Sequence, residues 1–338
     1  MGLVKQVRFG NSGLRISPII LGCMTFGSKA WNSWLLEDKE EVFALMKFCY
    51  DQGIRTFDTA DQYSNGLSER LICEFLKRYS IRRETVVIMS KIFFAVDEAI
   101  DVPQNINLAD AGVQLDVINQ RGLSRKHIMD GVARSVERLG TYIDVLQIHR
   151  FDAETPMEET MRALNDVVEL GQVRYLGASR MLGTQFAEYQ FVAQLNGWHQ
   201  FINWQSQYNL LYREDEREVI PFAKRHNIAL TPFYPNAGGL LARPLGQVSA
   251  RTKSDDPKVK KLTARDKEII NRVEQLSVEK GVSMAQISLA WLLHKGCYPI
   301  VGVNSIQRAQ ESIDALSLQL SEQDLLFLEE MYEPHKLI

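Results

Sequence analysis

Four side chains of different chemistry stand at or just beyond the ends of three predicted β-strands. Asp58 ends the first of these strands, and Tyr63 follows shortly after it. Lys91 ends the second strand, and His149 ends the third. Because neighbouring parallel strands lie about 4.8 Å apart, the ends of three successive strands fall within roughly 10 Å of one another. The sequence therefore predicts that the four side chains share one pocket.

A carboxylate, an amine, a phenol and an imidazole in one pocket can act together as a proton donor. A phenol has an ordinary pKa near 10, and we expect the Lys91 cation to stabilise the phenolate and to lower the pKa of Tyr63. Asp58 would pair with Lys91 and fix its charge, while His149 would hydrogen-bond an oxygen of the substrate. Tyr63 is then the predicted general acid, a role typically worth about 10² to 10⁴ in rate.

Each of these residues also has an ordinary structural explanation when it is taken alone. A strand-end aspartate most often caps a turn, and a lone histidine is more often a satisfied core group. Lys91 is harder to explain in this way, because it ends the apolar run VVIMSK and the burial of an ammonium without a partner is costly. The joint placement of the four residues is what favours catalysis.

The elements that must position these residues alternate between strand and helix. The run Pro18–Gly22 counts as the first strand. The later strands are predicted at Arg55–Asp58, Val86–Lys91, Tyr142–His149, Val173–Ser179, Phe201–Gln207, Ala229–Tyr234 and Tyr298–Val303. The helices are predicted at Lys39–Gln52, Ser68–Tyr79, Arg125–Leu139, Met157–Leu170, Thr184–Leu195, Glu214–His226, Ser283–His294 and Gln307–Leu316. Roughly eight βα units predict an α/β fold, a (β/α)8 TIM barrel, which we expect to be a single domain over residues 1–338.

Several segments lie outside this alternation. The turn cluster Asn11–Gly13 predicts an N-terminal β-hairpin, and Ser321–Tyr332 has the apolar spacing of an extra C-terminal helix. Long loops are predicted at Ile92–Leu123, after the third strand, and at Ala242–Thr263, after the seventh. Loops that follow barrel strands lie on the catalytic face, so we expect these two to choose the substrate.

Composition disfavours several classes of protein. The 338 residues include 39 Lys and Arg against 42 Asp and Glu, a formal net charge of −3, without a basic stripe. We therefore expect no nucleic-acid partner and no binding to an anionic membrane. The four cysteines form no CxxC pair, so neither a metal site nor a disulfide framework is expected. The sequence shows no signal peptide and no long apolar span, which favours a cytoplasmic protein.

The chain resembles the aldo-keto reductases along nearly its whole length. The matching stretches are GCMTFG, TFDTADQYSNGLSE, VVIMSK, YIDVLQIHRFD, VRYLGASRM, QSQYNLLYREDERE, GLLARP and IVGVNSIQRAQES. In detail they are similar to the aryl-alcohol-dehydrogenase-like branch of fungi and bacteria. The resemblance implies an NAD(P)H-dependent carbonyl reductase on a (β/α)8 barrel. Its catalytic tetrad would be Asp58, Tyr63, Lys91 and His149.

The resemblance also implies where the cofactor binds. Ser179 and Gln205 would hydrogen-bond the nicotinamide carboxamide, and Phe233 would stack on the nicotinamide ring. The adenosine 2′-phosphate and adenine end would lie along Gly302, Asn304, Ser305, Arg308, Gln310 and Glu311. A guanidinium beside a hydroxyl at a helix N-terminus suits a phosphate dianion, so NADPH is favoured over NADH. No GxGxxG motif follows a first strand, which disfavours a Rossmann site.

The cofactor site departs from the family pattern at four positions, one of which is Ser312, where Asn is usual. Arg180 follows Ser179 where an amide or a small hydroxyl residue is common, which implies an altered carboxamide contact or an extra cation in the pocket. Tyr234 and Gly238 replace the usual Ser and Arg in the stretch FYPNAGG, where Asn236 is also assigned to the cofactor. The bulk of Tyr234 near the cofactor diphosphate would change cofactor affinity.

An apolar pocket for small aryl or alkyl aldehydes and ketones is expected at the strand-end loops. Six aromatic residues gather there, although each of them could equally belong to the core: Phe26, Trp31, Trp34, Phe93, Phe94 and Phe151. Two other functions stay open, a regulatory subunit resembling the potassium-channel β-subunits and a nucleotide binder without catalysis. The lack of an N-terminal inactivating extension argues against the first, and the intact tetrad argues against the second. The sequence leaves the physiological substrate undetermined, and likewise the choice between monomer and homo-oligomer.

Overall fold

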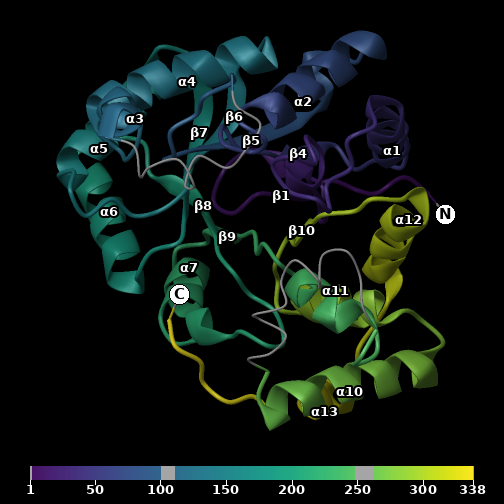
Figure 1. The fold of residues 1–338 in the computed structure, drawn as a ribbon. Helices are drawn as coiled ribbons and strands as arrows, with labels where there is room; N and C mark the ends of the chain where they lie inside the picture. The colour runs from purple at the N-terminus through teal and green to yellow at the C-terminus, as the bar shows by residue number, and fades with distance from the viewer. Residues whose placement is uncertain (1, 100–110, 248–261, 338) are drawn as a thin grey trace.

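Eight parallel strands form the wall of a barrel (Figure 1). The computed structural model describes residues 2–99, 111–247 and 262–337. The strands, in their order around the wall, are β10 (Ile300–Val301), β3 (Ile20–Gly22), β4 (Thr56–Asp58), β5 (Val87–Ile92), β6 (Ile143–Ile148), β7 (Val173–Ser179), β8 (Phe201–Gln205) and β9 (Ala229–Leu230). Backbone hydrogen bonds from Tyr298 to Leu230 (2.8 Å) and from Ile300 to Pro232 (2.9 Å) join the two ends of the sheet. The predicted (β/α)8 barrel is confirmed.

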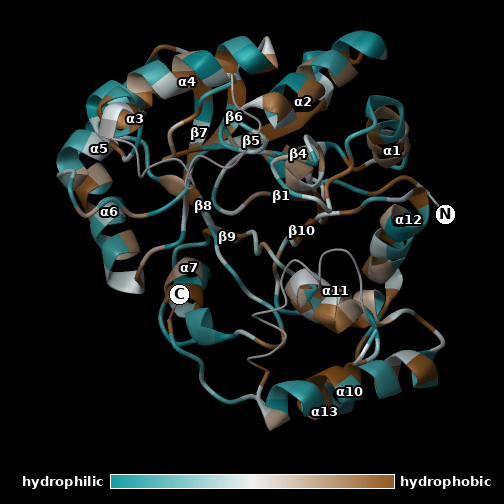
Figure 2. Cartoon of the chain, in the orientation of Figure 1, coloured by the Kyte–Doolittle hydropathy of each residue, from teal (hydrophilic) through white to brown (hydrophobic). Residues whose placement is uncertain are grey.

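A helix follows each strand and packs outside the barrel (Figure 1). These helices are α1 (Lys39–Asp51), α2 (Leu67–Arg78), α4 (Arg125–Leu139), α5 (Met157–Glu169), α6 (Gly183–Asn196), α7 (Val219–Arg225), α11 (Met284–His294) and α12 (Ile306–Asp314). Hydrophobic and hydrophilic residues alternate along most of them (Figure 2). In α5, for example, Met161, Leu164 and Val167 are buried at helical spacing. Burial of such a stripe stabilises each helix, because isolated helices of this length are marginal in water.

Proline residues explain why two predicted elements are shorter in the structure. The predicted helix Glu214–His226 is a 3-10 turn, Glu214–Glu216, followed by α7. Pro221 lacks an N–H and is tolerated only in the first turn of a helix, so one continuous helix from Glu214 is excluded. The predicted strand Ala229–Tyr234 stops after two residues because Pro232 cannot donate to the strand ladder.

One long helix, α10 (Ala264–Lys280), is absent from the predicted elements. Its start is fixed by a reciprocal cap between Thr263 and Asp266, in which each side chain accepts a hydrogen bond from the backbone N–H of the other. Its buried face is Ile269, Ile270, Val273 and Leu276. α10 packs against α11 and against the predicted extra C-terminal helix, α13 (Glu322–Glu329). None of the described helices, α10 included, has the length and apolar character needed to cross a membrane.

The two long loops follow β5 and β9, as predicted. Residues 100–110 of the first loop and 248–261 of the second lie outside the described residues. The first loop also contains a short helix, α3 (Ala111–Val117), where none was predicted. The second opens with a kinked 3-10 segment in which Gly238 (φ 69°) and Gly239 (φ 98°) take left-handed conformations that favour glycine.

The predicted N-terminal hairpin closes the amino end of the barrel. It pairs β1 (Val7–Arg8) with β2 (Arg15–Ile16) in antiparallel register. Phe9 and Ile16 are fully buried and join a cluster of strand residues that consists of Ile20, Met89, Val145, Ala229 and Ile300. Because this apolar plug fills the amino end, the opposite end, at which the strands finish, is the one left for a site.

Candidate active site

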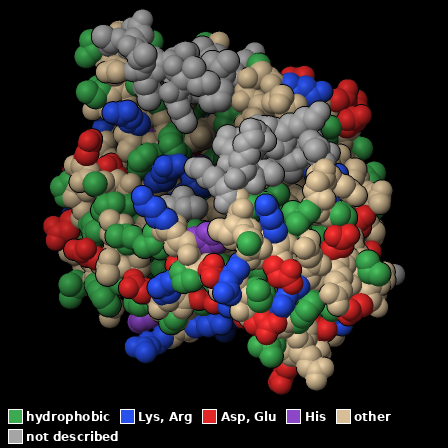
Figure 3. Space-filling view, turned by 60° about the horizontal axis from the view of Figure 1, so that its bottom comes forward, with side chains coloured by type: hydrophobic (Ala, Val, Ile, Leu, Met, Phe, Trp, Pro, Cys, Tyr) green, Lys and Arg blue, Asp and Glu red, His purple; other side chains and the backbone are tan. Residues whose placement is uncertain are grey.

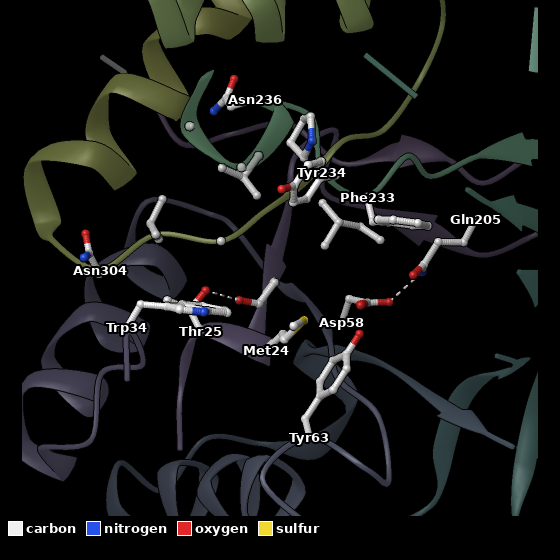
Figure 4. Close-up of a pocket in the computed structure, with 18 of the residues that line it drawn as sticks. Met24, Thr25, Trp34, Asp58, Tyr63, Gln205, Phe233, Tyr234, Asn236 and Asn304 are labelled. Carbon is white, nitrogen blue, oxygen red and sulfur yellow. Dashed lines mark hydrogen bonds between the residues drawn. The ribbon is translucent and has the colours of Figure 1, made fainter. Parts of the chain in front are cut away.

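The four residues of the predicted tetrad meet at the carboxyl end of the barrel. Asp58 is the last residue of β4, Lys91 lies near the end of β5, and His149 follows β6 directly. Tyr63 comes from the turn that links β4 to α2, and its hydroxyl points toward Asp58 (Figure 4). The Lys91 ammonium nitrogen lies 2.5 Å from a carboxylate oxygen of Asp58 and 3.1 Å from the Tyr63 hydroxyl. The structure therefore brings the predicted residues together.

Lys91 is held as a buried cation. Its ammonium donates to Asp58, to Tyr63 and to the backbone carbonyl of Thr59 (2.8 Å), which satisfies all three N–H groups. Burial lowers the pKa of Lys91, but the Asp58 carboxylate and the contact with Tyr63 outweigh burial, so the net shift is upward. An ammonium has no acceptor, so the Tyr63 oxygen accepts from Lys91 and its own O–H remains available.

The pKa of Tyr63 shifts in the opposite direction to the one predicted. Burial raises this pKa, the Lys91 cation lowers it only in part, and Asp58 adds to the rise. The expectation that Lys91 brings the pKa below its ordinary value is therefore wrong, because the removal of water from the phenolate outweighs the attraction of the cation. A raised pKa keeps Tyr63 protonated at neutral pH, so the residue has a proton to give.

His149 lies beside the phenol as a neutral imidazole. Its ring centre is 6.0 Å from that of Tyr63, and the two rings are nearly perpendicular. Burial, followed by the positive charges of Lys91, Arg180 and Arg150, holds the pKa of His149 well below its ordinary value. The Nδ1 atom is buried and has no hydrogen-bond partner among the residues that the structure describes. His149 lines the cavity, and a neutral imidazole can donate one ring N–H to a ligand oxygen without carrying charge.

A network of amides supports Asp58 from the barrel interior. Gln147 and Gln205 both donate to its second carboxylate oxygen, at 3.1 and 2.8 Å, and Asn203 donates to the Gln147 carbonyl at 2.8 Å. A dashed line in Figure 4 joins Gln205 to Asp58. Sequence analysis missed Gln147 and Asn203. Their signal was a polar residue at an inward position of a buried strand, which is costly without partners.

A cavity of about 510 Å³ opens above the tetrad. Of the predicted pocket aromatics, Trp31, Trp34 and Phe94 line it, together with Met24. The other three predicted aromatics, Phe26, Phe93 and Phe151, are not among its lining residues. Phe26 is buried in the main core, Phe93 packs on the Phe94 ring (5.1 Å between ring centres), and Phe151 packs on Tyr189 (6.0 Å). For these three residues the predicted pocket role is corrected to a packing role.

The far end of the cavity has the character of an anion site. Arg308 follows the start of α12 and donates to the Asn304 side chain (2.7 Å), and Arg243, which the sequence analysis did not select, lines the same end. Burial, and then the positive charge of Arg308, lowers the pKa of Arg243. One of its buried nitrogens has no hydrogen-bond partner in the described part of the chain. At Gly302 a Cβ would lie only 2.6 Å from the Thr25 hydroxyl, so the wall has no room for a side chain there. These residues fit a phosphate group.

Most residues assigned to the cofactor line this cavity. They are Ser179, Arg180, Gln205, Phe233, Tyr234, Asn236, Gly238, Gly302, Asn304, Arg308 and Glu311. Figure 4 shows Phe233 and Gln205 on the side of Asp58, and Asn304 across the cavity from them. Ser305 and Gln310 are not lining residues: the Ser305 hydroxyl accepts from the Arg308 backbone N–H as the cap of α12, and Gln310 donates to Asp314. The assignment of these two residues to the cofactor stays a prediction.

Known proteins match the chain along almost its whole length. A Saccharomyces cerevisiae protein is 63% identical over 341 residues, which cover 99% of each chain. Its name assigns it provisionally as the aryl-alcohol dehydrogenase AAD16. A Schizosaccharomyces pombe protein with a similar provisional name is 50% identical over 333 residues, 96% of this chain and 95% of its own. Versiconal hemiacetal acetate reductase of Aspergillus parasiticus is 46% identical over 337 residues, 98% of each chain.

The match extends to the family as a whole. Residues 18–333 fit the sequence model of the Aldo/keto reductase family. These findings confirm the resemblance drawn from the motifs, and the chain therefore belongs to the aldo/keto reductase family of oxidoreductases.

Proposed function

We propose that the protein is an NADPH-dependent reductase of aldehydes and ketones in which Tyr63 is the general acid. The observation that carries this proposal is the contact of one buried ammonium, that of Lys91, with both Asp58 and the Tyr63 hydroxyl at the wall of a cavity. A phenol that accepts from a fixed cation directs its own proton away from that cation and toward a ligand.

Each residue of the tetrad has a separate task in this proposal. When bound, NADPH supplies the hydride that reduces the carbonyl carbon. His149 binds the carbonyl oxygen, and Tyr63 transfers its proton to that oxygen as negative charge develops there. Lys91 stabilises the phenolate that remains, and Asp58 holds Lys91 in place. In the reverse direction the same groups remove a proton from an alcohol.

The choice of NADPH rests on the paired cations at the far end of the cavity. Arg243 and Arg308 approach closely enough for the charge of one to lower the pKa of the other. Among the residues that the structure describes, neither forms an ion pair with a carboxylate, so a phosphate is their natural partner. We assign them to the 2′-phosphate that distinguishes NADPH from NADH, with Asn304 as the third contact.

The substrate class in this proposal is a small carbonyl compound with an apolar body. Trp31, Trp34 and Phe94 supply apolar surface beside the tetrad. The names of the yeast relatives refer to aryl alcohols, and that of the Aspergillus relative to a hemiacetal acetate. An aryl aldehyde or aryl ketone is therefore the first substrate to test.

The proposal also covers the number of domains and the cellular location of the protein. We propose that the chain works as one domain, because β3, near the N-terminus, pairs with β10, near the C-terminus, and neither half closes the barrel alone. All four cysteines are free and buried, which suits a reducing compartment.

The experiment is a measurement of NADPH absorbance with a panel of aryl and alkyl aldehydes and ketones. The parent should consume NADPH with at least one of them, and Tyr63→Phe should lower kcat/KM by about 10² to 10⁴. Tyr298→Phe is the matched control, because that hydroxyl donates to Arg8 at the opposite end of the barrel. Equal activity of Tyr63→Phe and the parent would overturn the assignment of the acid.

The cofactor assignment is tested separately with Arg308→Ala. This variant should raise KM for NADPH by about tenfold or more, because one charge-assisted contact to phosphate is lost. KM for NADH should change little, since NADH lacks that phosphate. An unchanged KM for NADPH would remove Arg308 from the site.

A further inference from the structure

Two arginines beside the tetrad have no carboxylate partner among the described residues. Arg150 follows His149 directly after β6, and Arg180 follows Ser179 at the end of β7, the neighbouring strand. The backbone N–H of Phe151 donates to the Arg180 carbonyl (3.2 Å), which ties the two strand ends together. Both arginines line the cavity. On the face drawn in Figure 3, lysine and arginine side chains likewise gather near the centre, beside a histidine.

Arg180 is half-buried and Arg150 is exposed, and their contacts differ from those of two arginines that form ion pairs elsewhere in the protein. Arg83 pairs with Asp144 and Arg138 with Glu69, both in interior positions. The guanidinium of Arg180 instead lies over the Phe233 ring, 4.7 Å from its centre. That of Arg150 lies 5.2 Å from the centre of the Phe94 ring. An aromatic face leaves the N–H groups at the edge of a guanidinium available, so both groups can still bind an anion.

The backbone at Arg180 holds its side chain at the cavity in spite of strain. Its φ is +48°, a left-handed conformation that is unfavourable for a residue with a Cβ. Burial, followed by the positive charge of Arg150, lowers the pKa of Arg180. A strained backbone and a cation without an anionic partner persist at a cavity wall when the surrounding structure, or a ligand, offsets their cost.

We propose that Arg180, assisted by Arg150, binds a carboxylate carried by the carbonyl substrate, so that the preferred substrates are anionic aldehydes or ketones. The planar fork of a guanidinium matches a carboxylate with two parallel hydrogen bonds. Arg180 is close enough to Tyr63 and His149 for its charge to act on both, so one small molecule can reach the tetrad and the arginine together. This inference rests on the proposed carbonyl reduction, and it is distinct from the phosphate site at Arg243 and Arg308.

The first test compares the binding of benzoate with that of benzamide, which has nearly the same shape without the charge. Protein saturated with NADP+ is titrated with each, and the fluorescence of Trp31 and Trp34 in the cavity reports binding. The parent should bind benzoate about 10- to 100-fold more tightly than benzamide. Arg180→Met should abolish that preference, and Arg180→Lys should restore part of it. Equal affinities in the parent, or a preference that survives in Arg180→Met, would overturn the proposal.

Arg174→Met is the matched control, because Arg174 is an exposed arginine near the start of the same strand, β7, and donates to Gly171. It should keep the full benzoate preference. The affinity of Arg180→Met for NADPH, measured by titration, shows whether the variant has lost cofactor instead of the substrate anion. A loss of cofactor binding large enough to account for the change in benzoate binding would contradict the proposal.

The second test measures kcat/KM for 4-formylbenzoate and for its uncharged methyl ester. Arg180→Met should lower the value for the acid about 10- to 100-fold more than the value for the ester. An equal fall for both would mean that Arg180 acts on the cofactor or on Tyr63, and the proposal would be wrong. If the parent reduces the ester but shows no preference for the acid, the anion site fails while the proposed function stands. If neither is reduced but benzoate binding depends on Arg180, the anion site stands while the proposed function fails.

Discussion

Two buried ion pairs lie on opposite faces of β5, and only one of them adjoins the cavity. Lys91 faces the barrel interior and pairs with Asp58, whereas its neighbour Ser90 faces the helices and donates to Glu69 (2.5 Å). Successive strand residues point to opposite faces, so a single strand serves both clusters. Glu69 in turn pairs with Arg138 (2.7 Å) between α2 and α4. All four charged side chains are almost fully excluded from solvent.

The two pairs differ in what they leave available to a ligand. Arg138 directs its donors to Glu69, Ser135 and Glu98, so that cluster is completed within the protein. Lys91 also satisfies its three donors, but one of its acceptors is the Tyr63 oxygen, and the proton on that oxygen adjoins the cavity. Burial of opposite charges therefore does not identify an active site. What points to an active site is an ion pair in contact with a group whose proton faces a cavity.

The largest expected difference between the two pairs is in activity. Lys91→Met should lower kcat/KM by about 10² to 10⁴, because Tyr63 loses the cation that stabilises its phenolate. It should also lower the free energy of unfolding by about 3–5 kcal/mol, since Asp58 is left buried without its cation. Steady-state kinetics and urea denaturation measure the two effects on the same preparation.

A double variant separates activity from stability at this pair. Lys91→Met combined with Asp58→Asn removes the unpaired charge and should regain much of the lost stability, yet it should remain as inactive as Lys91→Met. If activity returned with stability, the role of Lys91 would be structural, and the contrast between the two pairs would disappear.

We call the Arg138–Glu69 pair, which has no contact with the cavity, the sealed pair. Its loss should lower stability and leave activity unchanged. Arg138→Met leaves the Glu69 carboxylate buried without its cation and should lower the free energy of unfolding by about 3–5 kcal/mol. Its kcat/KM, measured at a temperature where the variant is fully folded, should match that of the parent. Urea denaturation and steady-state kinetics again give both values, and Glu69→Gln added to Arg138→Met should recover stability. A folded Arg138→Met variant as inactive as Lys91→Met would show that the sealed pair serves catalysis too.

The contrast between the two faces of β5 also shows what sequence could and could not provide. The tetrad was predictable because all four residues stand at or just after strand ends and a lysine in an apolar run demands a partner, which Asp58 supplies. The packing direction of Phe26 and Phe94 was not, since both are aromatics in strand-end loops. Only the path of each loop decides that Phe94 lines the cavity and Phe26 enters the core.

Other features were missed because they depend on burial and on contacts between distant residues. The pKa of Tyr63 depends on burial opposed by a nearby cation, and sequence gives the cation without the degree of burial. The amides Gln147 and Asn203 were overlooked because each looks like an isolated polar residue in a strand, while their partners lie on neighbouring strands. Helix α10, in contrast, carried readable signals in the cap at Thr263 and in its apolar spacing.

The smallest expected effect separates the two clusters by pH. Burial and neighbouring cations hold the pKa of His149 well below its ordinary value near 6.5, so the folded protein keeps this ring neutral. Below about pH 6.5 the unfolded chain takes up a proton at His149 that the folded chain does not. Stability falls wherever the unfolded state binds more protons as pH decreases, so this group should remove at most about 1.4 kcal/mol per pH unit on acidification.

Urea denaturation at about pH 7.5, 6.5 and 5.5 measures this contribution to the free energy of unfolding. His149→Asn should weaken the loss of stability on acidification, because the side chain that titrates only in the unfolded chain is gone. Arg138→Met should keep the full loss, since the sealed pair contains no histidine and leaves His149 in place. Parallel pH profiles for the parent and His149→Asn would mean that the ring is not held neutral in the folded protein. The residues at the cavity and the sealed pair would then not differ in how they make stability depend on pH.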